Sequence, residues 1–538
     1  MGCTGVAARV VFLNVTDREF LQEQGNARAI RQEVLPAYRG VIYDRHGEAL
    51  AVSTPVAAIW TDPSFVRLSG EAIEQVADVL ERDPAGLAAE LEASAGREFL
   101  YLARRVPWDV AERLRGLGLD GVYVQREYRR YYPAGEMAAH VVGMTNIDDL
   151  GLEGIELSYD EHLRGRPGRK TVLKNRRGET IEDLEFQSAP HYGEDITLSL
   201  DMRLQFMAYR ELKAAVAGNH AKSGSLVMLD AGTGEVLALV NEPSYNPNDL
   251  GGASREGMRN RAVTDTYEPG STIKPFTVLA ALATPRWAPQ TPIDTAPGYF
   301  RVGNKLVQDP VNRGTITLSQ ALAKSSQVGI AKVALDLEPG AVFDVLNQAG
   351  VGEFIGTGLP GEAAGRLSDQ GLDNAVVRAT LAYGYGLAVS PLQLAQGYLT
   401  LATGGARLPV TVLKTEPERV RARPVFDPAR TRTVLEMMEA VTEDAGTAPR
   451  ARVPGYRIAG KTGTARKVGP QGYDDERHVA LFAGVAPLSD PRFVMVVVIN
   501  EPGGSARGGG AVAAPVFGQV AARALRLLGV EPDGEVAI

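Results

Sequence analysis

The 538-residue chain contains only one cysteine, Cys3, so it can form neither an intramolecular disulfide nor a cysteine-based metal site. Its six histidines are scattered, and no H-E-x-x-H pattern is present to suggest a metal-dependent hydrolase. The G-x-S-x-G pattern of α/β-hydrolases is also missing. The formal net charge of −8 argues against nucleic acid as a partner, because phosphate backbones are bound by basic surfaces. We therefore expect no metal, no other cofactor and no nucleic acid.

Long apolar runs are lacking as well. A membrane-spanning helix needs roughly 20 consecutive apolar residues. The first apolar run, residues 6–15, contains Arg9 and Asn14 and is much shorter. The run at residues 493–499 is rich in β-branched residues, which favours a buried strand. We predict no complete spanning helix, and a lead-in over residues 1–38 that is the remnant of a membrane-proximal segment.

The chain is too long for a single hydrophobic core, so two or more domains are expected. Residues 39–192 mix short strands and turns with one helical stretch at residues 71–95. From residue 195 onward, strands and helices alternate. We predict a β-rich N-terminal pedestal domain over residues 39–192, a second domain over residues 195–528, and a tail over residues 529–538.

The second domain begins with a predicted strand at residues 196–200 and a helix at residues 202–216, which Asp201 can cap. Residues 225–230 and 235–240 are typical of a hairpin. Further helices are predicted at residues 272–282, 318–337, 391–402 and 515–528, and further strands at residues 456–459, 480–485 and 493–500. Strands, then helices, then strands predict an α+β fold, with a helical cluster packed on an antiparallel sheet.

Ser271 and Lys274 are a candidate nucleophile and its base. They lie three residues apart, so on a helix they share a face. Pro275 is tolerated only near a helix start, which places that start close to Ser271. There the helix dipole stabilises developing negative charge, and free N–H groups can form an oxyanion hole. Serine needs a nearby base, and Lys274 can serve if burial lowers its pKa. Alone, a Ser-x-x-Lys pattern is too common to be specific.

A second pattern begins at Lys461 and continues with Thr462, Gly463 and Thr464. The lysine offers a cation, and the two threonines offer hydroxyls for a carboxylate. A glycine in a strand lets a ligand backbone lie close alongside. The same residues also fit an edge strand protected by a lysine, so this pattern is weak on its own.

A third pattern, Ser325 and Gln327, lies between the other two and can place a hydroxyl and an amide in a site, although it also fits a solvent-facing stretch. The order Ser271, Ser325, Lys461 resembles the three-part signature of penicillin-recognising serine enzymes. The chain resembles class B penicillin-binding proteins, most closely the division-specific septal type called penicillin-binding protein 3. Segments similar to that family lie at residues 39–47, 56–63, 129–133, 151–156, 233–237, 245–248 and 446–448.

The resemblance implies a transpeptidase domain of the β-lactamase type after the pedestal, and a serine acyl-enzyme mechanism. Ser271 is expected to attack the penultimate D-Ala of a peptidoglycan stem peptide, with Lys274 as base. Ser325, close to Lys461, is expected to relay a proton to the leaving group. β-Lactams are expected to acylate the same serine.

The resemblance also implies the binding groups and the location. Thr462 and Thr464 are expected to hold the substrate carboxylate beside Gly463, and the N–H groups of Ser271 and Thr464 to form the oxyanion hole. Gln327 is expected to bind the substrate amide. The implied place is the periplasmic face of the bacterial inner membrane, beside a septal lipid-II polymerase and other division proteins.

Gln327 departs from the family, which usually has asparagine there, and carries its amide one methylene further out. An inactive scaffold with the family fold therefore stays open as an alternative, because fold does not imply function. A D,D-carboxypeptidase or a β-lactamase would use the same serine, although the large N-terminal domain favours the transpeptidase.

A different alternative uses the same lysine. Residues 455–462 fit the nucleotide-binding pattern G-x-x-x-x-G-K-T. That loop requires a helix immediately after the lysine, so that the helix N-terminus faces phosphate. Gly463, Gly469 and Pro470 follow Lys461 closely and disfavour such a helix.

Overall fold

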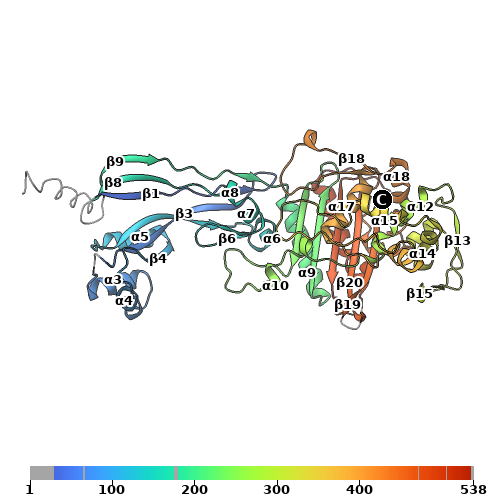
Figure 1. The fold of residues 1–538 in the computed structure, drawn as a ribbon, viewed down its shortest axis with the longest axis horizontal. Helices are drawn as coiled ribbons and strands as arrows, with labels where there is room; N and C mark the ends of the chain where they lie inside the picture. The colour runs from blue at the N-terminus through green and yellow to red at the C-terminus, as the bar shows by residue number, and fades with distance from the viewer. Residues whose placement is uncertain (1–29, 65–66, 175–179, 470–471, 505, 535–538) are drawn as a thin grey trace, which may run out of the picture.

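The structure is a computed structural model that describes residues 30–64, 67–174, 180–469, 472–504 and 506–534. The molecule is elongated, with a β-rich pedestal at one end and a wider α+β domain at the other (Figure 1). This arrangement confirms the predicted fold class. The predicted lead-in lies largely outside the described residues, as does the end of the predicted tail. Within the described ranges, no helix combines the length and the apolar character that a membrane crossing requires.

The pedestal contains two sheets. Three long strands form one of them, in the order β1 (Ile30–Leu35), β8 (Gly168–Lys174), β9 (Thr180–Ser188). The other is built around β3 (Ala49–Thr61), which pairs with β2 (Ile42–Tyr43), β4 (Leu100–Val106) and β5 (Tyr123–Tyr131), and β10 (Ile196–Thr197) joins it beside β2. Short elements follow β5: η1 (Gly135–Met137), α6 (Ala139–Val142), β6 (Met144–Thr145), β7 (Gly151–Glu153), α7 (Gly154–Ser158) and α8 (Asp160–Leu163).

The single helical stretch predicted at residues 71–95 is wrong, because the structure has two helices there. Ser69 caps α3 (Gly70–Val79), and Asp83 caps α4 (Pro84–Ala93). Pro84 occupies the first turn of α4, where its missing N–H costs nothing, but it cannot continue a preceding helix. A further helix, α5 (Trp108–Gly116), packs with them against the apolar face of β3.

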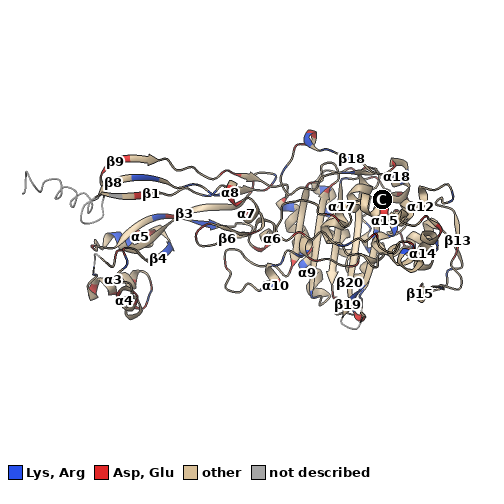
Figure 2. Ribbon diagram, viewed as in Figure 1, with Lys and Arg blue, Asp and Glu red and all other residues tan. Residues whose placement is uncertain are grey.

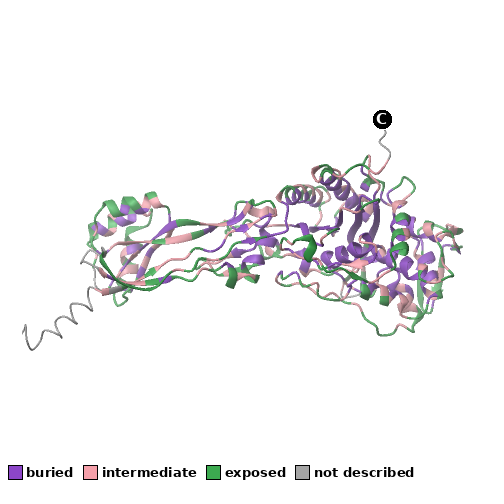
Figure 3. Ribbon diagram, turned by 90° about the horizontal axis from the view of Figure 1, so that it is seen from above, coloured by how far each residue is buried: buried purple, intermediate pink, exposed green. Residues whose placement is uncertain are grey.

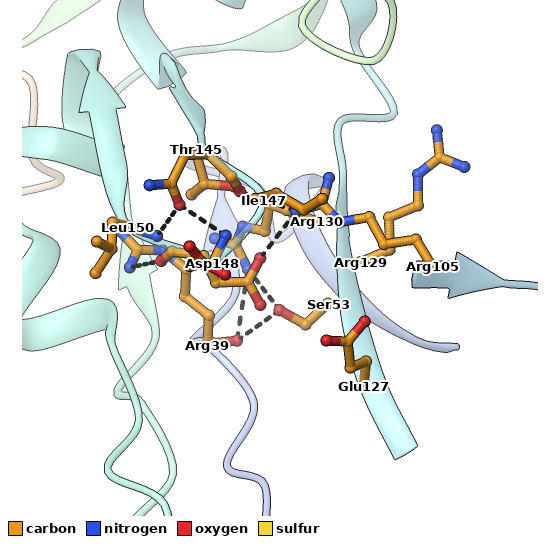
Figure 4. Close-up of polar contacts among 12 residues, drawn as sticks. Arg39, Ser53, Arg105, Glu127, Arg129, Arg130, Thr145, Ile147, Asp148 and Leu150 are labelled. Atoms are coloured by element: carbon orange, nitrogen blue, oxygen red, sulfur yellow. Dashed lines mark hydrogen bonds and ion pairs between the residues drawn. The ribbon is translucent and has the colours of Figure 1, made fainter. Parts of the chain in front are cut away.

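Buried ion pairs join separate segments within the pedestal. The Glu156 carboxylate accepts from Arg39 Nε at 2.5 Å and from Arg130 Nε at 2.6 Å, and all three side chains are almost fully buried. Arg39 also pairs with Asp160 at 2.6 Å. Figure 4 shows Arg39, Ser53 and Arg130 converging, with the Ser53 hydroxyl between the Arg39 carbonyl and the Arg130 guanidinium. Removing one member of such a network leaves a buried charge unpaired.

The base of the pedestal is hydrogen-bonded to the second domain. Asn248 exchanges two hydrogen bonds with the Tyr132 backbone, at 2.8 and 2.9 Å. The imidazole of His140 lies 2.8 Å from the carbonyl oxygen of Gly257, and burial lowers the pKa of His140 to about 4, so this histidine is neutral at physiological pH. Buried polar contacts of this kind oppose free rotation of one domain against the other.

The second domain is built on an antiparallel sheet in the order β12 (Val236–Glu242), β11 (Ser223–Asp230), β21 (Phe493–Asn500), β20 (Gly472–Ala486), β19 (Ala459–Gly469). The central strand β21 is buried throughout, and its side chains alternate between two apolar clusters. Figure 3 shows buried residues concentrated in this sheet and the helices around it, whereas charged residues of both signs are spread over the molecule (Figure 2).

Helices cover both faces of the sheet. On one face lie α9 (Met202–Gly218), capped by Asp201 as predicted, and α20 (Ala514–Leu527). On the other lie α12 (Lys274–Leu282), α17 (Pro391–Ala402) and α18 (Pro428–Glu439). The remaining elements are α10 (Arg255–Met258), α11 (Arg261–Thr264), η2 (Gly270–Ile273), β13 (Pro292–Asp294), β14 (Tyr299–Val302), β15 (Lys305–Gln308), β16 (Thr315–Thr317), α15 (Ala341–Gln348), α16 (Ala375–Leu381), β17 (Ala406–Arg407), η3 (Pro417–Arg419), β18 (Arg423–Pro424), η4 (Pro449–Ala451) and α19 (Gly509–Val512).

The long helix predicted at residues 318–337 is interrupted. The structure has α13 (Leu318–Ala323) and α14 (Gln327–Asp336), because Ser325 adopts a left-handed backbone conformation with φ of +57°. The predicted strand at residues 196–200 is also shorter, since β10 ends at Thr197 and Leu198 makes an isolated bridge to Leu413. A strand was predicted at residues 456–459, but β19 begins only at Ala459, the last of these residues.

Candidate active site

Ser271 lies in the 3-10 turn η2, which leads directly into α12, and Pro275 occupies the first turn of that helix as predicted. A hydrogen bond from the Gly270 N–H to the Gly384 carbonyl, at 3.1 Å, joins this turn to the loop after α16. A side chain at Gly384 would overlap the Gly270 carbonyl, so only glycine permits this close approach. The sequence around Ser271 therefore builds a tightly supported turn at the start of a buried helix.

Two lysines converge on the hydroxyl of Ser325. Lys274 Nζ lies 3.2 Å from Ser325 Oγ and donates to the Ser325 carbonyl at 2.6 Å. Lys461 Nζ lies 3.0 Å from the same Oγ. Among the described residues the Ser271 hydroxyl makes no hydrogen bond, so the predicted hydrogen bond between Ser271 and Lys274 is not formed. Catalytic hydrogen bonds are often long before substrate binds, so an open contact is compatible with a nucleophile and its base.

Both lysines are fully buried, which changes their proton affinity. Burial lowers the pKa of Lys274 to about 7, while the Asp309 carboxylate raises this pKa and Arg313 lowers it. Burial also lowers the pKa of Lys461 well below its usual value, and the charge of Lys274 lowers it further. At neutral pH a substantial fraction of Lys274 is therefore uncharged and able to accept a proton.

Strand β19 carries Lys461 along the edge of the sheet and contacts the turn η2. A Cβ atom at Gly463 would lie 2.8 Å from the Pro269 carbonyl oxygen. The glycine therefore allows the backbone just before Ser271, and not only a ligand, to lie close to β19. The Thr462 hydroxyl lies 2.9 Å from that of Thr447. The Thr464 hydroxyl accepts from the Gly509 N–H at 3.2 Å.

The same strand overturns the nucleotide-binding alternative. Lys461 and Thr462 lie inside β19, which continues as extended backbone to Gly469. A phosphate-binding loop needs a helix N-terminus at this point, and the strand leaves none.

An open cleft of about 700 Å³ lies beside these residues. Among the predicted site residues, Gln327 and Thr464 line it. Its other walls are formed by Lys305, Leu306, Gln308, Asp309, Pro310, Thr380, Tyr383, Tyr385, Gly386, Arg466, Tyr473 and His478. The cleft is mostly polar in its residue types, which suits a peptide with amide and carboxylate groups.

Several residues of the cleft were not predicted from the sequence. Tyr385 packs edge-on against Tyr383, from the same loop after α16, and against Tyr473 of β20, with ring centroids 5.7 and 5.5 Å away. Burial raises the pKa of Tyr383 to about 12, so this ring stays neutral. Asp309, just after β15, binds the segment that follows Ser325. No local sequence pattern links Tyr473 or Asp309 to the rest of the cleft, because the fold alone brings these two residues to it.

Known proteins resemble this chain along almost its whole length. A family model described as the penicillin-binding protein transpeptidase domain matches residues 224–522, and one described as the penicillin-binding protein dimerisation domain matches residues 34–198. The peptidoglycan D,D-transpeptidase FtsI of Escherichia coli is 43% identical over 530 residues, which is 98% of this chain and 90% of the relative. The probable peptidoglycan D,D-transpeptidase PbpC of Pseudomonas aeruginosa is 40% identical, again over 98% of this chain and 93% of the relative.

Solved structures agree with these relatives. Penicillin-binding protein 3 of Mycobacterium tuberculosis in complex with aztreonam is 27% identical, with a TM-score of 0.71 over 94% of this chain and 99% of that one. The transpeptidase domain of Burkholderia pseudomallei penicillin-binding protein 3 is 40% identical, with a TM-score of 0.58 over 63% of this chain and 98% of that one. With the three motifs gathered in one site, these matches show that the chain belongs to the penicillin-binding protein family of peptidoglycan D,D-transpeptidases, in its division-specific penicillin-binding protein 3 type.

Proposed function

We propose that the chain cross-links peptidoglycan stem peptides through a serine acyl-enzyme on Ser271, and that β-lactams acylate the same serine. The observation that carries the proposal is the Ser325 hydroxyl held between Lys274 and Lys461, at 3.2 and 3.0 Å. Proton transfer requires such a chain of donors and acceptors, whereas a scaffold does not. Two buried lysines without ion pairs are costly, and a protein without chemistry would gain nothing from them.

Acylation begins when Ser271 Oγ attacks the carbonyl carbon of the penultimate D-Ala. Lys274 Nζ takes the hydroxyl proton, and the N–H groups of Ser271 and Thr464 stabilise the oxyanion of the tetrahedral intermediate. The C–N bond to the terminal D-Ala then breaks. Its nitrogen takes a proton from the Ser325 hydroxyl, which is reprotonated by the neighbouring lysines, and free D-Ala leaves.

Transfer reverses these proton movements. An amine of a neighbouring stem peptide attacks the ester carbonyl of the acyl-enzyme, and its proton passes through Ser325 to the lysines. The ester C–O bond breaks, Ser271 Oγ regains a proton from Lys274, and the new amide is the cross-link. Each step moves one proton along the same lysine–serine–lysine chain, so no cofactor is needed.

The cleft supplies the groups that hold the substrate. Thr464 lines it, and Thr462 lies two residues earlier on the same side of β19; in this proposal the two threonines bind the substrate carboxylate. Gln327, the first residue of α14, also lines the cleft, and its role in this proposal is to bind the substrate amide. The relatives named above support a place in cell-wall synthesis. We place the chain at the periplasmic face of the inner membrane, next to a septal lipid-II polymerase.

Labelling with a fluorescent penicillin tests this proposal. Wild type is expected to form a stable covalent adduct, and Ser271→Ala is expected to form none. Ser319→Ala is the matched control, because Ser319 lies in α13, outside the site. Unlabelled wild type that unfolds cooperatively would support the scaffold alternative, and a label that persists in Ser271→Ala would place the nucleophile elsewhere.

A further inference from the structure

Asp309 is a buried acid for which the steps above have no use. It directly follows β15, is 3% exposed and borders the cleft. Its Oδ2 accepts a hydrogen bond from the Ser326 hydroxyl at 2.5 Å. Its Oδ1 accepts from the N–H groups of Gln327 at 2.6 Å and Val328 at 3.2 Å. All three donors belong to the segment that immediately follows Ser325.

These hydrogen bonds complete the N-terminus of α14. The first N–H groups of a helix have no partner within it, and Asp309 accepts from the first two. The third is accepted by Ser326 Oγ, which lies 2.9 Å from the Gly329 nitrogen. A negative charge at this end is also favoured by the helix dipole. The start of α14 is therefore fixed by a residue from a separate hairpin, not only by its own cap.

The backbone just before this start is strained. Ser325 has φ of +57°, a conformation that a non-glycine residue keeps only when its surroundings hold it there. On one side, Lys274 Nζ donates to the Ser325 carbonyl at 2.6 Å. On the other side, Asp309 holds the residues that follow. The position of the Ser325 hydroxyl, between two lysines, depends on both restraints.

Asp309 also affects the charges at the site. Lys274 is influenced by Asp309, which favours its protonated form, and by Arg313, which disfavours it. Lys461 lies on the other side of the shared Ser325 hydroxyl and is a second positive group. Among the described residues, neither Asp309 nor any other carboxylate forms an ion pair with Lys274. The carboxylate therefore acts on the lysine at longer range, in addition to holding the backbone.

We propose that Asp309 is a positioning residue for acylation: it holds the Ser325–Gln327 segment so that the Ser325 hydroxyl meets both lysines and the Gln327 side chain faces the cleft. The inference rests on the proposed function, because it concerns the same acylation step. Asp309 touches none of the reacting atoms and acts through this segment. It also explains how Gln327 can replace the family's asparagine, since the backbone at this position is set by Asp309 and not by the amide.

Two substitutions separate the hydrogen bonds from the charge. Asp309→Ala removes both, and the second-order rate constant of acylation by a fluorescent penicillin is expected to fall about 100-fold, as misplacing a catalytic group does. Asp309→Asn keeps an acceptor oxygen for the two N–H groups and should lose much less. Because the charge that favours protonated Lys274 is gone, the rise of the rate with pH should move to lower pH. Asp294→Asn, at the end of β13, is the control and should leave the profile unchanged.

The outcomes are distinguishable. If folded Asp309→Ala acylates like wild type, or if Asp309→Asn loses as much as alanine with no movement of its pH profile, Asp309 has only a structural role and the inference fails. If Asp309→Ala does not fold, the pH profile of Asp309→Asn decides by itself. If wild type forms no adduct that depends on Ser271, the proposed function fails and this inference fails with it.

Discussion

The buried charges of the pedestal and those of the active site are arranged in opposite ways. In the pedestal, Arg39 and Arg130 share the carboxylate of Glu156. Burial lowers the pKa of Arg39, but Glu156 and Asp160 more than compensate and raise it overall. In the active site, Lys274 and Lys461 are equally buried, yet among the described residues neither has a carboxylate in an ion pair.

The difference separates charges that hold structure from charges that do chemistry. A paired buried charge keeps its proton and fixes geometry, and it is lost only at a large cost in stability. An unpaired buried lysine gives up its proton near neutral pH and becomes a base, at the expense of stability. Substitutions in the two regions should therefore affect different properties of the protein.

The largest effect on activity is expected from Lys274→Met, which replaces the base by an apolar chain of similar length. Acylation by a fluorescent penicillin should fall by about 100- to 10,000-fold, the usual contribution of a general base. The free energy of unfolding should change little, because removal of a costly buried amine offsets the loss of its hydrogen bond to the Ser325 carbonyl. Stopped-flow labelling and urea unfolding measure the two quantities, and normal acylation by folded Lys274→Met would mean that Lys274 is not the base.

The opposite pattern is expected from Glu156→Gln. Arg39 and Arg130 then lack their shared counter-charge, and the free energy of unfolding should fall by about 3–5 kcal/mol. Acylation by the molecules that remain folded should be unchanged. Glu112→Gln breaks an exposed pair with Arg115 and serves as the control, with little effect. Loss of acylation in folded Glu156→Gln would show that the pedestal controls the site.

The smallest effect is expected from Gln327→Asn, which restores the residue usual in the family. A shift of one methylene in a binding pocket changes binding by roughly tenfold. Acylation should rise by no more than this, with unchanged stability, because Asp309 already fixes the backbone at this position. A rate increase of several orders of magnitude would instead indicate that the wild-type site is impaired.

The sequence was sufficient for the regular elements and insufficient for the polar contacts between them. Strand β21 and helix α17 have the predicted bounds, because an unbroken apolar run rich in β-branched residues and a proline after a capping serine are local signals. The break at Ser325 was missed, since Asp309 and Lys274 impose it from distant parts of the chain. Asp309 itself follows an ordinary hairpin strand and has no pattern that could distinguish it.

The most direct test of the contrast between the two regions is the ionisation of Lys274 itself. The protein would be labelled with 13Cε-lysine and titrated by NMR, with Lys274→Met to assign the resonance. A midpoint near pH 7 is predicted for Lys274, because burial lowers its pKa to about 7. A Lys274 resonance that stays protonated up to the usual lysine range, above about pH 10, would contradict the account.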